Sequence, residues 1–208
     1  MGIFLPTEEN LKKASAVLKN GGIIAYPTET FYGLGTNPLD ESAVKRLFDI
    51  KGRDFDKPVS ILVKDLNALS LVAEEIPPAA ERLIKRFWPG PLTIVFRAKK
   101  NIPLILTANT GRIGVRVSSS PIAKRLLGII DMPLTATSAN PSGEKSPVTA
   151  EEVEIYFRDK VDMILDGGKL QGKVGSTIID ATTGRDLECI REGDIPFAVI
   201  LEYCKNLS

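Results

Sequence analysis

The strongest constraint on the fold is an alternation along nearly the whole chain, in which short apolar runs typical of strands follow segments with helical periodicity. The apolar runs predict strands at residues 23–26, 59–63, 92–96, 113–117, 134–137, 161–165, 177–180 and 187–191. The periodic segments predict one helix after Thr7, one after Asp40, and two that span 66–73 and 79–88. A further helix is predicted from Ser120 to about Leu127, and another begins at the capping box of Thr149 and Glu152. No repeat or linker interrupts this pattern, so we expect a single α/β domain over residues 1–208, with helices flanking a sheet. Because the last predicted strands follow one another too closely for helical crossovers, the sheet should be mixed.

The composition excludes several kinds of catalytic and metal site. The chain has no histidine, which removes Ser-His-Asp catalysis, Cys-His catalysis and histidine-ligated zinc. Its two cysteines, Cys189 and Cys204, are too few for a four-ligand structural zinc site. Lysine and arginine number 27 against 26 acidic residues, so the whole molecule has no electrostatic reason to coat nucleic acid or an anionic membrane. An anionic ligand must therefore be held by a local cluster of cations.

The sequence shows no pattern of a targeting or membrane segment. The first residues, Met1 to Pro6, lack the basic and then apolar pattern of a signal peptide. No apolar run approaches the roughly 18 residues that a membrane span needs. Together with the low cysteine content, this predicts a cytoplasmic protein that does not enter a membrane.

Two polar segments next to predicted core elements are candidates for ligand contact. Residues 27–35 follow a buried strand directly and combine small hydroxyl side chains with glycines, as a ligand-lining turn does. The alternative is that these glycines serve backbone geometry alone. Lys51, Arg53 and Lys57 place three cations in one loop, which suits a polyphosphate, although a solvated surface loop has the same composition.

Two further segments carry polar groups at the ends of predicted strands. Residues 138–143 come directly after an apolar strand and offer hydroxyl and amide donors, although such residues also form ordinary turns. Arg112 and Arg116 flank another predicted strand. Since Arg116 has apolar neighbours on both sides, it must either reach a cleft or pair internally.

Taken together, these segments resemble the YrdC/TsaC family, the threonylcarbamoyl-AMP synthases, in its short form, over about residues 11–191. The matching motifs are Pro-Thr-Glu-Thr-x-Tyr-Gly-Leu at 27–34, Lys-x-Arg at 51–53, Pro-Gly-Pro-Leu-Thr at 89–93, Val-Arg-Val at 115–117, Ser-x-Asn at 138–140, Ser-Thr-Ile at 176–178 and Arg-Glu-Gly at 191–193. The resemblance implies the YrdC-like fold, a single domain with a twisted mixed sheet, flanking helices and a large concave basic pocket. Longer relatives carry a histidine where this chain has Leu62.

The resemblance also implies which residues bind the substrates. The residues expected to contact ATP are Arg53, Lys57, Arg112, Ser138, Ser146 and Arg191. Those expected around threonine are Thr30, Arg116, Ala136 and Ser176. The catalytic tetrad around the phosphates corresponds to Lys51, Arg53, Ser138 and Asn140. No protein metal site is expected, because the sequence shows no compact group of acidic residues, and Mg²⁺ would be carried by the triphosphate.

The implied reaction converts L-threonine, bicarbonate or CO2, and ATP into L-threonylcarbamoyl-AMP and pyrophosphate, for threonylcarbamoyladenosine modification of tRNA. This makes the chain a nucleotidyltransferase whose product passes to a tRNA threonylcarbamoyl-transferase complex. Contact of the protein itself with tRNA or double-stranded RNA is left open. Two alternatives remain, an RNA-binding or ribosome-assembly module and a catalytically inactive YrdC-like paralogue.

Overall fold

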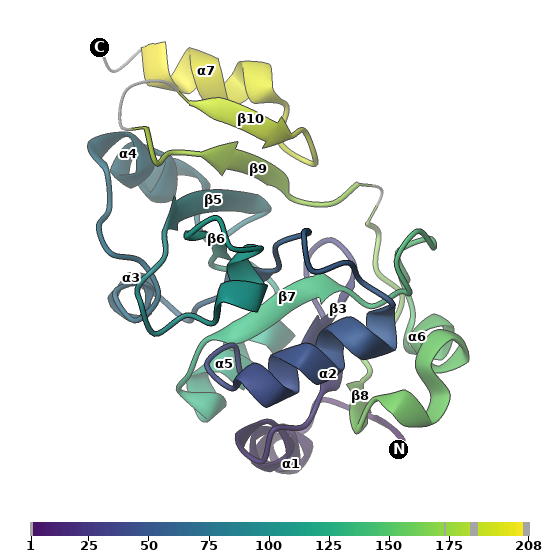
Figure 1. Ribbon diagram of the computed structural model, residues 1–208. Coiled ribbons are helices and arrows are strands. Elements are labelled where there is room, and N and C mark those ends of the chain that lie inside the picture. The colour runs from purple at the N-terminus through teal and green to yellow at the C-terminus, as the bar shows by residue number, and fades with distance from the viewer. Residues whose placement is uncertain (1, 173, 184–186, 206–208) are drawn as a thin grey trace.

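The computed structural model describes residues 2–172, 174–183 and 187–205. Its strands are β1 (Ile3–Phe4), β2 (Ile24–Pro27), β3 (Tyr32–Gly35), β4 (Ser60–Leu62), β5 (Leu92–Arg97), β6 (Arg112–Arg116), β7 (Leu134–Ser138), β8 (Met163–Leu165), β9 (Thr177–Asp180) and β10 (Glu188–Arg191). Within the described residues they form one ten-stranded sheet in the order β1-β8-β2-β3-β7-β4-β6-β5-β9-β10. Figure 1 shows β10 at one end of the molecule and the N-terminus at the other.

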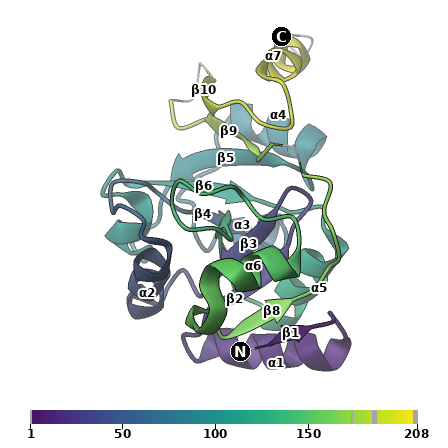
Figure 2. The same cartoon turned by 90° about the vertical axis from the view of Figure 1, so that its right-hand side faces the viewer.

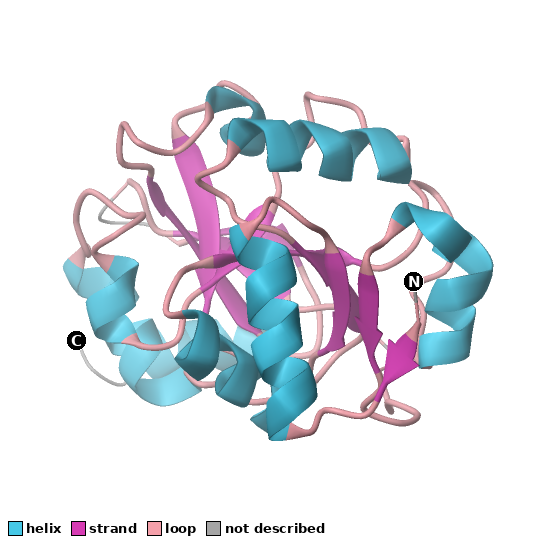
Figure 3. Ribbon diagram, turned by 90° about the horizontal axis from the view of Figure 1, so that it is seen from below, coloured by secondary structure: helices cyan, strands magenta, loops and turns pink. Residues whose placement is uncertain are grey.

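The helices lie on both sides of this sheet, as Figure 3 shows. In the described part of the chain they are α1 (Glu8–Lys19), α2 (Glu41–Lys51), α3 (Leu66–Leu69), α4 (Pro78–Phe87), α5 (Pro121–Ile130), α6 (Ala150–Phe157) and α7 (Phe197–Lys205), with short 3-10 turns η1 (Leu104–Thr107) and η2 (Arg158–Lys160). Helices α1 and α7 lie at opposite ends of the molecule in two perpendicular views (Figures 1 and 2). None of the helices described has the length and apolar character that crossing a membrane requires.

The sheet is mixed, as the sequence predicted. Strand β8 pairs in parallel with β1 and β2, β4 in parallel with β6, and β5 in parallel with β9. The other neighbours, including β3 with β7 and β7 with β4, are antiparallel. This order brings the turn after β2 and the loop after β7 to the middle of the sheet, although they lie far apart in the sequence.

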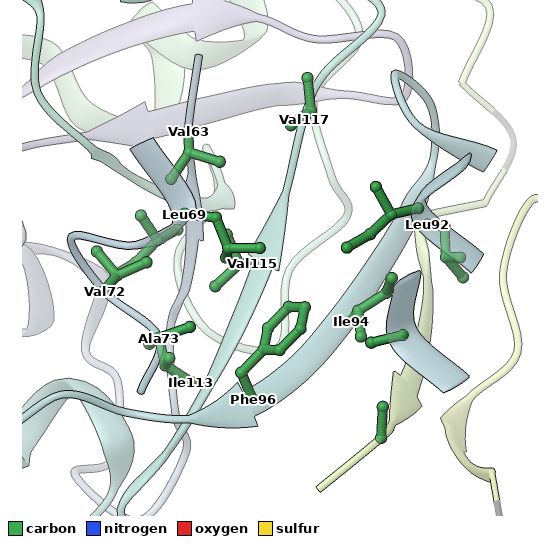
Figure 4. Close-up of a cluster of buried hydrophobic side chains, with 14 of the residues drawn as sticks. Val63, Leu69, Val72, Ala73, Leu92, Ile94, Phe96, Ile113, Val115 and Val117 are labelled. Carbon is green, nitrogen blue, oxygen red and sulfur yellow. The ribbon is translucent and has the colours of Figure 1, made fainter. Parts of the chain in front are cut away.

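Alternate residues along the strands supply cores on opposite faces. In β2, Ile24 and Tyr26 pack with α1 and α5, whereas Ala25 packs with α2 and α6 on the other face. A third and larger cluster lies between β4, β5 and β6 and the helices α3, α4 and α7. Figure 4 shows part of it, where Val115 of β6 and Phe96 of β5 lie among side chains from neighbouring elements.

Local sequence signals account for most of the helix ends. Thr7 accepts a hydrogen bond from the N–H of Asn10 at the start of α1, and Asp40 accepts from the N–H groups of Ser42 and Ala43 at the start of α2. The predicted capping box opens α6, with both reciprocal hydrogen bonds present. Side-chain capping therefore decides where these helices begin.

Two local predictions differ from the structure, and two elements were not predicted at all. The helix predicted over 66–73 ends at Leu69, because the chain that follows pairs with the end of β5: the carbonyl of Val72 accepts from the N–H of Lys99, and the N–H of Glu74 donates to the carbonyl of Arg97. Residues 27–35, predicted as a turn, turn only at the start and then form β3. The glycines of β3 hid its strand character, yet Gly35 is needed there, since a Cβ at this position would meet the side chains of Tyr26 and Leu134. Strand β1 and helix α7 were not predicted.

The 3-10 turn η1 offers a matched pair of leucines for testing this core. Leu106 is fully buried in the third cluster, whereas Leu104, two residues earlier, is 66% exposed. Leu106→Ala should lower the free energy of unfolding by about 2–5 kcal/mol because it leaves a cavity, and Leu104→Ala by less than about 0.5 kcal/mol. Urea denaturation of both variants measures the difference. Equal losses would contradict the placement of η1.

Candidate functional site

A cavity of about 250 Å³ opens across the middle of the sheet. Its walls come from the turn between β2 and β3, the loop after α2, the ends of β6 and β7, and the start of β9 and the end of β10. The predicted site residues that line it are Thr30, Arg53, Arg116, Ala136, Ser138, Ser146, Ser176 and Arg191. The structure thus brings together two thirds of the predicted side chains, from seven separate segments of the chain.

Arg116 lies at the carboxyl end of β6, with only 6% of its surface exposed. Its Nη1 donates to Oε1 of Glu29, and Ser118 donates to the other carboxylate oxygen of Glu29. The sequence left two options for this arginine, reaching a cleft or pairing internally, and the structure shows both at once. Buried arginine needs such a partner, since an uncompensated charge in the interior is costly.

Two more guanidinium groups face the same cavity. Arg53 is held by the carbonyls of Lys57 and Pro58, at 3.0 and 2.8 Å. Arg191 donates to the carbonyl of Ser176 from both Nε and Nη2, at 3.2 and 2.7 Å. Each group is therefore fixed by backbone carbonyls rather than by a neutralising carboxylate.

The guanidinium groups also influence one another. Burial lowers the pKa of Arg53, and the charge of Arg191 acts in the same direction. Burial likewise lowers the pKa of Arg191, with the charge of Arg116 adding to the effect. A bound anion would relieve this repulsion, so the cavity favours negatively charged ligands.

Lys51 and Asn140 lie beneath the cavity and do not line it. The Nζ of Lys51 donates to the carbonyls of Ser138 and Asn140, at 2.5 and 2.6 Å, and the lysine is only 2% exposed. Burial first, and the charge of Arg53 second, lower the pKa of Lys51 to about 7. Its position joins the end of α2 to the loop after β7, so it shapes the wall that Ser138 presents.

Lys57 and Arg112 also lie outside the cavity lining. Lys57 is exposed and pairs with Asp54 at 2.6 Å. Arg112 starts the strand that Arg116 ends, and it pairs with the buried Asp180 at 2.7 Å. Both cations are thus partly neutralised by these carboxylates.

The turn after β2 is built by its own hydroxyl groups. The Oγ1 of Thr28 accepts from the N–H groups of Thr30 and Phe31 at 3.2 and 3.3 Å. Gly172, from the segment after β8, packs so closely on the carbonyl of Thr30 that a Cβ there would overlap it. The chain after β8 therefore braces the turn that presents Thr30 to the cavity.

Sequence reasoning missed several residues of the site, above all Glu29 and Ser118. Glu29 stands inside a motif that the sequence singled out, but nothing local shows that it contacts a residue 87 positions away. The one available signal was the need of Arg116 for a counter-charge. Thr93 was missed as well, and its hydroxyl lies 2.9 Å from that of Ser176.

Comparisons with known proteins show the family to which the chain belongs. The family model Sua5_yciO_yrdC, described as "Telomere recombination", matches residues 16–193. The chain belongs to this family. Its fold is accordingly the YrdC-like α/β fold, as the resemblance implied.

Curated relatives from two archaea show how much of the chain is shared. The threonylcarbamoyl-AMP synthase of Pyrococcus abyssi is 41% identical over 193 residues, which are 93% of this chain and 56% of that protein. A putative threonylcarbamoyl-AMP synthase of Methanocaldococcus jannaschii is 40% identical over 198 residues, covering 93% of this chain and 92% of that protein. The chain therefore spans about half of the first relative and nearly all of the second.

A solved structure of the same family supports the fold directly. The crystal structure of Pyrococcus abyssi Sua5 complexed with L-threonine superposes with a TM-score of 0.93 at 39% identity, and the match covers 98% of this chain and 61% of that one. In the present chain, Leu62 stands where longer relatives were expected to carry a histidine. It is fully buried in the core that packs against α1 and α5. That side chain is accordingly absent from the residues that line the cavity.

The buried Lys51 predicts a specific pH dependence of stability. Its pKa is lower in the folded state than the ordinary value of 10.5, so the unfolded chain binds more protons between about pH 7 and 10.5 and this lysine makes stability rise with pH. Lys51→Met removes that rise. The loss of unfolding free energy in Lys51→Met should therefore be larger at pH 9.5 than at pH 7.5, by up to about 1.4 kcal/mol for each pH unit.

Urea denaturation at the two pH values measures this difference. Lys45→Met removes an exposed lysine from the same helix and serves as the control, with the same effect expected at both pH values. A pH-independent effect of Lys51→Met would contradict the lowered pKa.

Proposed function

We propose that the protein binds ATP and L-threonine in this cavity and makes L-threonylcarbamoyl-AMP from them with bicarbonate or CO2, releasing pyrophosphate. The observation that carries the proposal is that three fixed guanidinium groups, of Arg53, Arg116 and Arg191, face one cavity. Such a set suits a carboxylate and a chain of phosphates bound side by side. The names of the relatives, threonylcarbamoyl-AMP synthases, support the same reaction.

Threonine is proposed to bind at the inner end of the cavity, with its carboxylate on Arg116. The arginine is buried there, and a desolvated guanidinium binds a carboxylate more strongly than an exposed one. Thr30 and Ser176 are also buried and bring hydroxyl groups to the same cavity, and Ala136 offers a small apolar surface. These groups would surround the amine and the side chain of threonine.

The phosphates of ATP are proposed to bind Arg53 and Arg191, with the hydroxyl groups of Ser138 and Ser146 nearby. Lys51 and Asn140 would complete this set from outside the cavity lining. The Nδ2 of Asn140 donates to the carbonyls of Pro141 and Glu144, whereas its buried Oδ1 has no hydrogen-bond partner within the described residues. The roles of Lys57 and Arg112 in ATP binding stay predictions.

The proposed reaction needs no protein nucleophile. The threonine amine adds to CO2 and loses a proton, giving a carbamate. A carbamate oxygen then attacks the α-phosphorus of ATP, and the bond from that phosphorus to the bridging oxygen of the β-phosphate breaks to release pyrophosphate. The arginines would hold the reactants in line and offset the charge that builds up on the leaving phosphates.

Mg²⁺ is proposed to enter with the triphosphate. The described residues that line the cavity include no aspartate or glutamate, and no group of three or more potential metal ligands occurs among the residues that the structure describes. Phosphate oxygens and water would therefore supply most ligands of the ion, as Mg²⁺ prefers. When bound, it would neutralise phosphate charge.

The cellular setting follows from the proposed reaction. A mixed carbamic-phosphoric anhydride is labile, so the product is proposed to pass to a tRNA threonylcarbamoyl-transferase complex in the cytoplasm. Direct contact with tRNA or double-stranded RNA stays a prediction.

Pyrophosphate release tests the reaction. Purified protein with ATP and Mg²⁺ should release pyrophosphate when both threonine and bicarbonate are present, and mass spectrometry should detect the threonylcarbamoyl adenylate. Omitting either substrate should abolish release. A folded protein that releases none under any combination would contradict the proposal and favour an inactive paralogue. Salt-dependent RNA binding without a response to threonine would instead favour an RNA-binding module.

Two conservative substitutions test the assignment of the arginines, and each serves as the control for the other. Lysine keeps the charge but loses the planar pair of donors. Arg116→Lys should raise KM for threonine by about tenfold or more and change KM for ATP little, whereas Arg53→Lys should do the reverse. Steady-state kinetics with each substrate varied in turn give both constants. If each variant raised KM for threonine and KM for ATP alike, separate subsites would be contradicted.

A further inference from the structure

Glu29 contacts Arg116 but does not itself line the cavity. Its chain neighbours Thr28 and Thr30 both line the cavity, whereas Glu29 does not. Its Oε1 accepts a hydrogen bond from Nη1 of Arg116, a residue that does line the cavity. The side chain of the arginine is 7% exposed and that of the glutamate 14%.

The carboxylate of Glu29 is itself fixed by a network around the start of α5. Ser118, which is fully buried, donates to Oε2, and its Oγ accepts from the N–H of Ser120 at 3.2 Å. Ser120 is the N-cap of α5 and donates to the carbonyl of Pro27 at 3.1 Å. Pro27, where the turn begins, and Glu29 within it are therefore both tied to the same helix start.

This arrangement leaves part of Arg116 free. Within the described residues only Nη1 of its guanidinium donates to protein, so Nε and Nη2 retain their donors. A guanidinium whose third corner is held by a carboxylate can still present two parallel donors along another edge. Arg116 also lines the cavity, so a ligand there can approach its guanidinium.

We propose that Glu29, held by Ser118, is a positioning residue that fixes the Arg116 guanidinium so that its free edge receives the carboxylate of the amino-acid substrate. This inference rests on the proposed function and names a further residue for it. An arginine that is already ordered loses less conformational freedom when it binds, so the fixed geometry increases affinity. Glu29 contacts neither substrate, and its effect passes entirely through Arg116.

A competing role makes the opposite prediction. If the carboxylate of Glu29 occupied the seat of the substrate carboxylate, removing its charge would free Arg116 and lower KM for threonine. If Glu29 positions Arg116, removing its charge loosens the guanidinium and raises KM for threonine. The sign of the change therefore separates the two roles.

The test uses Glu29→Gln, which keeps the size and one acceptor oxygen but removes the charge. Positioning predicts that KM for threonine rises about 10- to 100-fold, the size of effect expected when a hydrogen bond between charged groups is lost, while KM for ATP stays within about twofold. Glu144→Gln is the matched control, because it removes the same charge from an exposed position on the loop after β7 and should change neither constant. Ser118→Ala keeps the charge but releases one carboxylate oxygen, so it should raise KM for threonine in the same direction by a smaller factor.

Several results would overturn the inference. An unchanged or lowered KM for threonine in Glu29→Gln does so, and so does an equal rise in both KM values. Should Glu29→Gln fail to fold, Ser118→Ala decides in the same way. The wild-type protein separates this inference from the proposed function. If the wild type makes no adenylate, both the proposed function and the inference are contradicted. If the wild type is active and Glu29→Gln leaves KM for threonine unchanged, only the inference is contradicted.

Discussion

A buried guanidinium at the end of a central strand is the constraint on which the site depends. Arg116 is almost fully excluded from water, and an uncompensated charge there would destabilise the fold. Glu29 supplies the counter-charge from a turn 87 residues away in the sequence, and Ser118 fixes that glutamate. One ion pair therefore joins the turn after β2 to the end of β6 and the start of α5. The cavity exists in its present form because these three segments meet there.

The sheet order makes that meeting possible. Strands β3, β7, β4 and β6 are consecutive neighbours, so only β7 and β4 separate the strand that follows the Glu29 turn from the strand that carries Arg116. Lys51 ties α2 to the loop after β7 through two backbone carbonyls, and Arg191 is tied to Ser176 in a similar way. The cations are thus held by backbone groups that belong to the fold. A site of this kind is ordered before any ligand binds, which suits a reaction that relies on positioning.

The sequence predicted the parts of the structure that depend on neighbouring residues. Apolar runs and capping residues such as Thr149 located most strands and helix starts, because those signals act within a few positions. The glycines of β3 concealed a strand whose partners lie on both sides of it in the sheet. Family motifs pointed to most of the cavity lining, but composition did not distinguish Lys51, buried beneath it, from the exposed Lys57. The partner of Arg116 was beyond local reasoning, because pairing over that separation is decided by the tertiary fold.

A crystal structure of the protein with L-threonine and a non-hydrolysable ATP analogue is the most direct test of this account. The account predicts that the threonine carboxylate lies along the Nε and Nη2 edge of Arg116, while Nη1 still donates to Glu29 and the triphosphate contacts Arg53 and Arg191. A carboxylate bound elsewhere in the cavity, or an Arg116 that has left Glu29 to reach its ligand, would contradict it.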